Sequence, residues 1–276
     1  MRCRNLRKRG FLLFVALAFV SFAVPARVSA QFGPPPPAAP APNPRATEPL
    51  DLTGYWVSVV TEDWRFRMMT PDKGDYGGVP LTQEGHQLAE SWDPAKDVAS
   101  GNQCRPYGAA GLMRLPERLH ITWQDDNTLR VDTDAGTQTR LFHFGGPPPE
   151  GEKPSWQGYS VASWDGMRPM GAFQLPTVFA ARGSSSAPRP VADGYLKVIT
   201  TRMRSGYVRK NGAPYSANAV LEEYFDSFKE DNGDTWLVVT AIVTDPQYLY
   251  QPFITSSHFK KLPDATGWNP TPCEEK

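Results

Sequence analysis

The chain has 276 residues, with 29 basic and 29 acidic side chains, 28 prolines and an aromatic set of eight Trp, ten Tyr and fourteen Phe. Without the first thirty residues, which contain six basic and no acidic side chains, 23 basic residues face 29 acidic ones, a formal charge of −6. A moderately acidic protein lacks the basic surface that binds phosphate backbones, so we expect no nucleic-acid partner.

Residues 1–30 have the order of a secretory signal peptide. A basic stretch from Arg2 to Arg9 precedes an apolar run from Phe11 to Val24, and small residues end the segment at Ser29-Ala30. The alternative is a short N-terminal membrane anchor, but fourteen apolar residues are fewer than the roughly 20 that span a bilayer. We therefore expect a periplasmic or secreted protein with no membrane span after cleavage.

Residues 31–50 are predicted to form a Pro-rich linker. Eight prolines lie between Gly33 and Pro49, and such a segment behaves as an extended spacer. Residues 51–276 are predicted to form a single β-barrel domain.

Hydrophobic periodicity in this domain is mostly two, the period of β-strands. The predicted strands are 54–60, 64–68, 118–123, 128–133, 137–144, 156–164, 195–204, 218–228, 235–244 and 251–260. One helix is predicted after Thr82, which can cap it, with Leu88 and Trp92 on one face. The fold class is therefore all-β with one or two short helices, either a closed antiparallel meander barrel or, as the alternative, a β-sandwich.

The remaining cysteines are predicted to pair. Only Cys104 and Cys273 survive signal cleavage, and an isolated pair in an oxidising compartment usually forms a disulfide. This disulfide would close a loop of about 170 residues and add roughly 5 kcal/mol in the loop-entropy model. A metal-binding pair is disfavoured because no His lies at ligand spacing from either Cys.

A long connection rich in Pro, Gly, Ser and Ala joins the two halves of the barrel domain. It runs from Gly166 to Asp193, with Ser184-Ser185-Ser186 at its centre. Connections of this length are usually lids or disordered, and we expect one of these two.

Five short motifs occur in a fixed order along the domain. They are Asp51-Leu52-Thr53-Gly54-Tyr55-Trp56, Leu81-Thr82-Gln83-Glu84-Gly85, Trp156-Gln157-Gly158-Tyr159-Ser160, Trp164-Asp165-Gly166, and Asp245-Pro246 followed by Gln251-Pro252-Phe253. This order resembles a large group of secreted bacterial β-proteins. The resemblance implies a lipocalin-like or calycin-like barrel over most of residues 51–260 and brings no established activity. Members often have His where this chain has Tyr159, and Met167-Arg168-Pro169 interrupts the strand that they continue.

A carboxylate and a tyrosine near the C-terminus are the first candidate site residues. A two-residue turn at Asn232-Gly233 would place Glu222 opposite Val243 and Tyr224 opposite Ala241. Because the facing strand is apolar, Glu222 and Tyr224 are predicted to point into the barrel lumen. The alternative is a set of structural ion pairs along the barrel wall, such as Lys197 with Asp226.

Two histidines lie on neighbouring predicted strands. His120 and His143 could approach each other and form a metal or proton-transfer site, although half-buried strand histidines are more common. Ser160 lies in a Gly-Tyr-Ser-Val-Ala stretch similar to a nucleophile elbow, but no helix follows it, so we interpret it as an ordinary strand residue.

These features predict an exported β-barrel that binds a small apolar or amphipathic molecule in its lumen. The predicted ligand contacts are Trp123, Trp156, Tyr159, Arg202, Glu222, Tyr224 and Trp236. One alternative is an enzyme of isomerase or hydrolase type, with Glu222, Tyr224, His120 and His143 as candidate acid–base residues. The other is a structural or partner-binding envelope protein. We expect neither a cofactor nor a metal ion.

Overall fold

A computed structural model describes residues 43–166 and 194–273. The predicted signal peptide, most of the Pro-rich linker and nearly all of the connection 166–193 lie outside the described residues.

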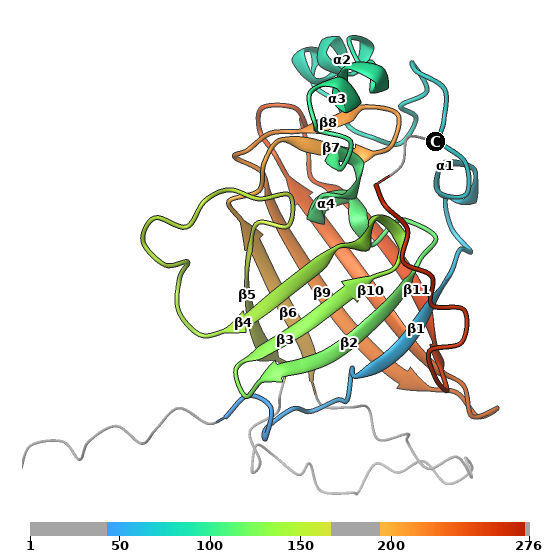
Figure 1. Cartoon of the computed structure of the whole chain (residues 1–276), viewed down its shortest axis with the longest axis vertical. Coiled ribbons are helices and arrows are strands. Elements are labelled where there is room, and N and C mark those ends of the chain that lie inside the picture. The colour runs from blue at the N-terminus through green and yellow to red at the C-terminus, as the bar shows by residue number, and fades with distance from the viewer. Residues whose placement is uncertain (1–42, 167–193, 274–276) are drawn as a thin grey trace, which may run out of the picture. The chain divides into compact units, whose positions relative to one another are not determined.

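Nine strands form a closed barrel in the order β1-β11-β10-β9-β6-β5-β4-β3-β2 (Figure 1). They are β1 (Gly54–Val59), β2 (Arg118–Asp125), β3 (Thr128–Thr133), β4 (Thr139–Phe144), β5 (Tyr159–Asp165), β6 (Tyr195–Thr201), β9 (Val220–Lys229), β10 (Thr235–Thr244) and β11 (Phe253–Leu262). The all-β barrel is thus confirmed over the sandwich.

The barrel departs from a pure meander at one place. Strands β4 and β5 pair in parallel, with Phe142 opposite Ser160, whereas every other neighbouring pair in the barrel is antiparallel. Parallel neighbours need a crossover rather than a hairpin. The loop 145–158 provides this crossover and projects from the barrel wall beside β4 and β5 (Figure 1).

Large apolar side chains fill the barrel interior. Trp56, Phe142, Phe225 and Phe259 are fully buried and belong to one cluster that extends across β1, β4, β9 and β11. Alternation along the strands sends these residues inward and their neighbours outward. The lumen is therefore a packed core along much of its length.

The chain before β1 closes one end of the barrel. Leu52 is part of the buried core, and its carbonyl accepts a hydrogen bond of 2.9 Å from the Trp56 indole. The indoles of Trp123 and Trp164 donate to Glu48 and to the carbonyl of Pro44 at 2.9 and 2.8 Å. Residues 43–50 of the predicted linker thus pack on the barrel, because the indoles of Trp123 and Trp164 form hydrogen bonds with them.

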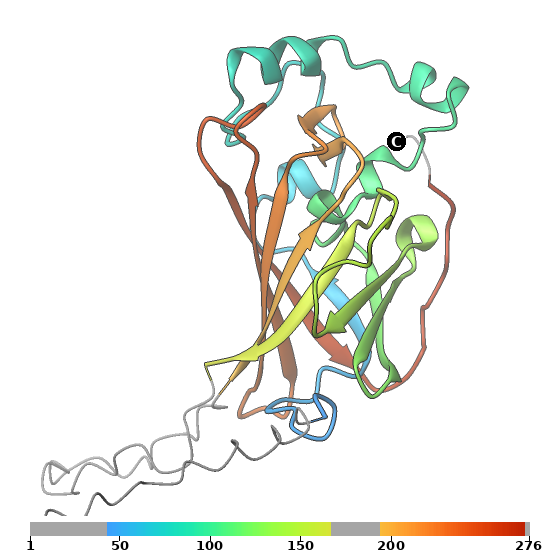
Figure 2. The same cartoon turned by 90° about the vertical axis from the view of Figure 1, so that its left-hand side faces the viewer.

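A cap of short elements covers the other end (Figures 1 and 2). Its members are α1 (Trp64–Arg67), α2 (Gln83–Glu90), α3 (Pro94–Ala99), η1 (Arg105–Tyr107), α4 (Ala109–Leu112) and the β7–β8 hairpin (Gly206–Arg209 and Ala213–Tyr215). Helix α2 begins as predicted, with the Thr82 hydroxyl accepting from the amide of Gly85 at 3.0 Å. A second buried cluster, including Tyr215, Leu221 and Phe253, joins the cap to the barrel.

Two strand predictions fail for local reasons. Residues 64–68 were predicted as a strand, but Trp64–Arg67 is the helix α1, in which Arg67 is buried while Trp64 and Met68 are exposed. A five-residue alternation is too short to separate a strand from a helix. The strand predicted to begin at Trp156 starts at Tyr159 instead, because Gly158 has φ +62° and lies against the carbonyl of Thr201, where a Cβ would clash.

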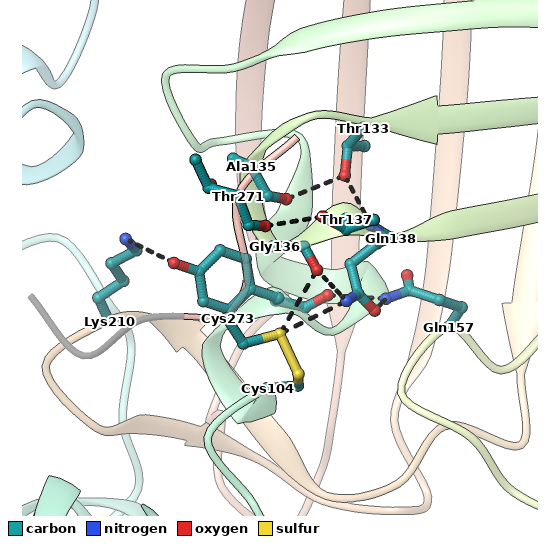
Figure 3. Close-up of a disulfide and its surroundings, with 11 residues drawn as sticks. Cys104, Thr133, Ala135, Gly136, Thr137, Gln138, Gln157, Lys210, Thr271 and Cys273 are labelled. Atoms are coloured by element: carbon teal, nitrogen blue, oxygen red, sulfur yellow. Dashed lines mark hydrogen bonds between the residues drawn. A yellow bond between two sulfur atoms is a disulfide. The ribbon is translucent and has the colours of Figure 1, made fainter. Parts of the chain in front are cut away.

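The predicted disulfide between Cys104 and Cys273 is confirmed (Figure 3). After β11 the chain returns along the outside of the barrel to the cap (Figure 2), where the amide of Thr271 donates to the carbonyl of Asp134. The bond joins residues 169 positions apart and ties this tail to the start of η1. The disulfide therefore secures the cap to the barrel wall.

Candidate functional site

The hairpin between β9 and β10 has a different register from the predicted one. Glu222 pairs with Ile242, one residue away from the expected partner Val243. Gly233 has φ +91° and donates its amide to the carbonyl of Glu230, while the Glu230 amide donates to Asp234. This is a three-residue loop ending in a left-handed glycine, a common alternative to the two-residue turn.

This shift turns the two predicted lumen residues to the outer face, because strand side chains alternate. The Glu222 carboxylate accepts from Lys197 Nζ at 2.9 Å and from the Tyr224 hydroxyl. These two partners, Tyr224 first, lower the pKa of Glu222, whose side chain is half-buried. Trp236 also lies on the outer side, because the adjacent Leu237 faces the core. The prediction that Glu222 and Tyr224 face the lumen is wrong.

The carboxylate that does face the lumen is Glu223. Its two oxygens accept hydrogen bonds of 2.9 and 2.5 Å from Arg140, and both side chains have no exposed surface. Arg140 also donates to Thr200, whose hydroxyl bonds that of Ser160 at 2.8 Å. Ser160 is thus a buried strand residue, and the charges of this lumen pair compensate each other.

The two candidate histidines do not converge. His120 stacks on Tyr55 with ring centroids 4.1 Å apart, and His143 stacks on Tyr159 at 4.6 Å. Their partners on β3 are four residues apart, about 13 Å along a strand, so no joint site forms. The described residues contain no group of three or more His, Cys, Asp or Glu placed to hold a metal ion.

A groove on the outer face of β4 brings three predicted site residues together. Trp156, Tyr159 and His143 line it with the loop 145–158, and its volume is about 720 Å³. Burial lowers the pKa of His143 despite the nearby Asp125 and Glu152. The guanidinium of Arg204 lies over the Trp156 ring, 3.8 Å from the ring centroid. The roles of these three residues as ligand contacts stay predictions.

The other two predicted ligand contacts lie elsewhere. Trp123 is half-buried at the closed end of the barrel and packs against Phe144 at 5.4 Å. Arg202 follows β6 with φ +55° and donates to the carbonyl of Glu152 at 3.1 Å. Neither points into a lumen cavity with the others.

A second hollow lies in the cap, and we call it the basic pocket. Its volume is about 430 Å³, and among the described residues its lining contains four basic and no acidic side chains. The lining residues are Phe66, Arg67, Met68, Met69, Thr70, Pro106, Gly111, Arg114, Leu115, Pro116, Val208, Arg209 and Lys210. Helix α4 can approach β7 closely because Gly111 has no Cβ, which would meet the carbonyl of Tyr207 at 2.7 Å.

Two of the four basic residues have carboxylate partners at the rim. Arg67 forms an ion pair with Glu62, and Arg114 forms one of 3.1 Å with Asp63. Arg67 also donates to the carbonyl of Arg114 at 2.8 Å, which links the two sides of the pocket. These pairs neutralise about half of the basic charge in the lining.

Arg209 and Lys210 have no carboxylate within ion-pair distance in the part of the chain that the structure describes. Arg209 is 5 % exposed, donates to the carbonyl of Gly77 at 2.9 Å and lies over the Phe66 ring at 4.1 Å. Its Nε has no partner among the described atoms. Burial, with repulsion from Arg114, lowers the pKa of Arg209 to about 10 against the attraction of Asp63 and Asp75, so it stays charged at neutral pH. Lys210 Nζ donates to the Tyr107 hydroxyl at 3.4 Å and lies 5.0 Å from the centroid of the Tyr107 ring.

A buried acid, Glu117, follows the pocket residue Pro116. Its exposed fraction is 4 %, and neither carboxylate oxygen has a hydrogen-bond partner among the described atoms. Burial and the nearby Asp134 raise its pKa well above the usual value, against the attraction of Arg140, Arg67 and Lys210. Glu117 is therefore a buried acid that is harder to ionise than a free glutamic acid, and the pocket cations Arg67 and Lys210 act on it.

No protein-family model, curated protein or solved structure matches this chain. In the described ranges, no helix has the length and apolar composition needed to cross a membrane.

The residues of the basic pocket were not found from the sequence. Arg67, Arg114 and Arg209 come from three separate segments, and no local motif joins them. The only local clue lies in residues 64–68, which were predicted as a strand but form the helix α1, in which Arg67 is the buried residue. Only the long-range packing of α1, α4 and β7 brings these cations together.

Proposed function

We propose that this protein is an exported β-barrel that binds a small amphipathic molecule with a negatively charged group, and that the ligand lies in the basic pocket. The signal-like N-terminus supports export, and the Cys104–Cys273 disulfide suits an oxidising compartment. The packed interior of the barrel favours a site in the cap over the predicted site in the lumen.

The observation that carries this proposal is the guanidinium of Arg209, which is buried and charged and has no carboxylate at ion-pair distance among the described residues. Asp63 and Asp75 act on it only from farther away. Removing a charge from water is costly unless another charge or several hydrogen bonds compensate it. In the lumen, Arg140 has this compensation from Glu223, whereas Arg209 has one carbonyl and one aromatic ring. An anionic group on a ligand would supply the missing partner, and Arg geometry suits carboxylates, sulfonates and phosphates.

The rest of the lining indicates an apolar part of the ligand. Phe66, Leu115 and Val208 contribute apolar surface beside the cations, and Met68 and Met69 are exposed at the same hollow. Methionine adapts to varied apolar shapes, so these two residues suit a flexible chain better than one rigid ring. A cavity of about 430 Å³ is within the range of small-molecule sites.

Calorimetric titration with three ligands of equal chain length tests the proposal. Octane-1-sulfonate should bind at least about tenfold more tightly than octan-1-ol, and octylammonium should bind most weakly, because only the sulfonate can compensate Arg209. Arg209→Met should remove the advantage of the sulfonate while leaving octan-1-ol binding unchanged.

Arg45→Met is the control, because Arg45 is exposed, pairs with Asp126 at 3.9 Å and does not line the basic pocket. This variant should bind all three ligands like the unmodified protein. Equal affinity for the sulfonate and the alcohol, or equal losses in the Arg45 and Arg209 variants, would exclude the proposal.

A further inference from the structure

The buried carboxyl of Glu117 has no structural partner, in contrast to the other buried acids of the barrel. Glu223 is bound by Arg140, and Asp245 accepts from the amide and the hydroxyl of Ser216 at 2.6 and 2.9 Å. Both oxygens of Glu117 lack a hydrogen-bond partner among the described atoms. A buried polar group of this kind needs an explanation, because it costs stability without a bond in return.

Glu117 lies next to the basic pocket. Its neighbour Pro116 lines the pocket, and its own carbonyl accepts from the amide of Ser58 at 2.9 Å. The Ser58 hydroxyl accepts from the pocket residue Arg67 at 3.3 Å. Ser58 of β1 thus contacts the backbone of Glu117 and the side chain of the pocket residue Arg67.

The charged groups around Glu117 come from four elements. Arg67 belongs to α1, Lys210 follows β7, Arg140 lies on β4, and Asp134 follows β3. Arg67 and Lys210 also line the pocket, so these two cations act on the acid and on any bound anion. No histidine lines the pocket within the described ranges.

We propose that Glu117 is a proton-linked counter-ion of the basic pocket, so that the pocket takes up an anion and a proton together. When Glu117 is protonated, the charge of Arg67 and Lys210 is free to attract the ligand. When Glu117 loses its proton, its carboxylate compensates the same two cations and repels the anion. By reciprocity, a bound anion makes Glu117 harder to ionise. This inference rests on the proposed function and adds its regulation.

The test is the affinity for octane-1-sulfonate measured between pH 5 and pH 9. This ligand stays ionised throughout the range, so its own titration contributes nothing. Affinity should fall by about tenfold or more as pH rises through the pKa of Glu117, the usual scale of coupling between two sites. Binding near that pKa should also take up a proton, seen as a heat that depends on the ionisation enthalpy of the buffer.

Glu117→Gln is the decisive variant, because Gln has nearly the same shape as the protonated acid and cannot ionise. Its affinity should match that of the unmodified protein at low pH and should not change with pH. Asp134→Asn removes the neighbouring negative charge, so the pH midpoint should move to a lower value. If Glu117→Gln does not fold, the pH midpoint of Asp134→Asn still tests the proton link.

The outcomes separate the two proposals. If octane-1-sulfonate binds neither protein at any pH, the proposed anion site is wrong. If it binds both the unmodified protein and the Glu117→Gln variant with the same pH profile, the site stands and the proton link is wrong. A midpoint that Asp134→Asn leaves unchanged would also contradict the link.

Discussion

Arg140 in the lumen and Arg209 in the basic pocket are both buried arginines, but only the first has an anionic partner. Arg140 forms a two-pronged pair with Glu223, and Thr200 accepts a further hydrogen bond from it. Arg209 has a carbonyl at 2.9 Å and an aromatic ring, while Asp63 and Asp75 attract it only from beyond ion-pair distance. The fold alone explains the paired charge of Arg140, and we propose an anionic ligand as the direct partner of Arg209.

The largest effect should come from replacing the lumen arginine. Arg140→Met leaves Glu223 buried without its partner, so the free energy of unfolding should fall by about 3–5 kcal/mol. Arg209→Met removes a buried charge that has no carboxylate at ion-pair distance among the described residues, and the carbonyl of Gly77 that it leaves is on an exposed residue. The unfolding free energy of this variant should stay within about 1 kcal/mol of the unmodified protein.

Both changes can be measured by denaturant unfolding without added ligand. A matched pair comes from the same residues changed to Lys, which keeps the charge but not the two-pronged geometry. Equal destabilisation by Arg140→Met and Arg209→Met would show that the two arginines have the same structural role.

The disulfide should affect the two regions unequally. Cys104→Ser with Cys273→Ser should lower the free energy of unfolding by about 2–4 kcal/mol, the typical contribution of a disulfide. Because the bond ties the tail to η1, whose Pro106 lines the basic pocket, octane-1-sulfonate binding should weaken as well. Hydrogen exchange should increase in the cap while the core strands β9 and β10 stay protected. Uniform loss of protection would contradict this division.

The smallest effect should come from the ion pair on the outer wall. Glu222→Gln removes the partner of Lys197 on a half-exposed surface, so the unfolding free energy should fall by less than about 1 kcal/mol. The pKa of Glu222 lies below its usual 4.5, so this contribution is present above that pH and is lost as pH falls through the lower value. Unfolding of both proteins between pH 2 and pH 7 measures the difference, and octane-1-sulfonate binding should not change.

The sequence predicted the barrel because period-two alternation and polar turns are local signals. The strand Thr235–Thr244 was predicted with its observed bounds, and the helix cap at Thr82 and the disulfide follow from equally simple rules. Register was harder, because two turn types fit Asp231-Asn232-Gly233 and they differ by one residue. Because of this one-residue difference in register, Glu223 faces the lumen in place of the predicted Glu222.

The site was less predictable than the fold for a different reason. The structure brings Trp156, Tyr159 and His143 together in a groove on the outer face of β4. Trp156 and Tyr159 were predicted as contacts of a ligand in the lumen, and His143 was predicted to approach His120, so this grouping was not predicted. Arg209 and Glu117 owe their properties to packing between segments far apart in the chain, which no local pattern contains. The lipocalin-like resemblance stays a prediction, since the closed barrel fits it without testing it.

The most direct test of the anion site is a crystal structure of the protein with octane-1-sulfonate. The account predicts the sulfonate oxygens within hydrogen-bond distance of the Arg209 guanidinium and the alkyl chain against Phe66, Leu115 and Val208. A sulfonate bound in the groove beside His143, or in the barrel lumen, with the basic pocket filled by water alone, would contradict it.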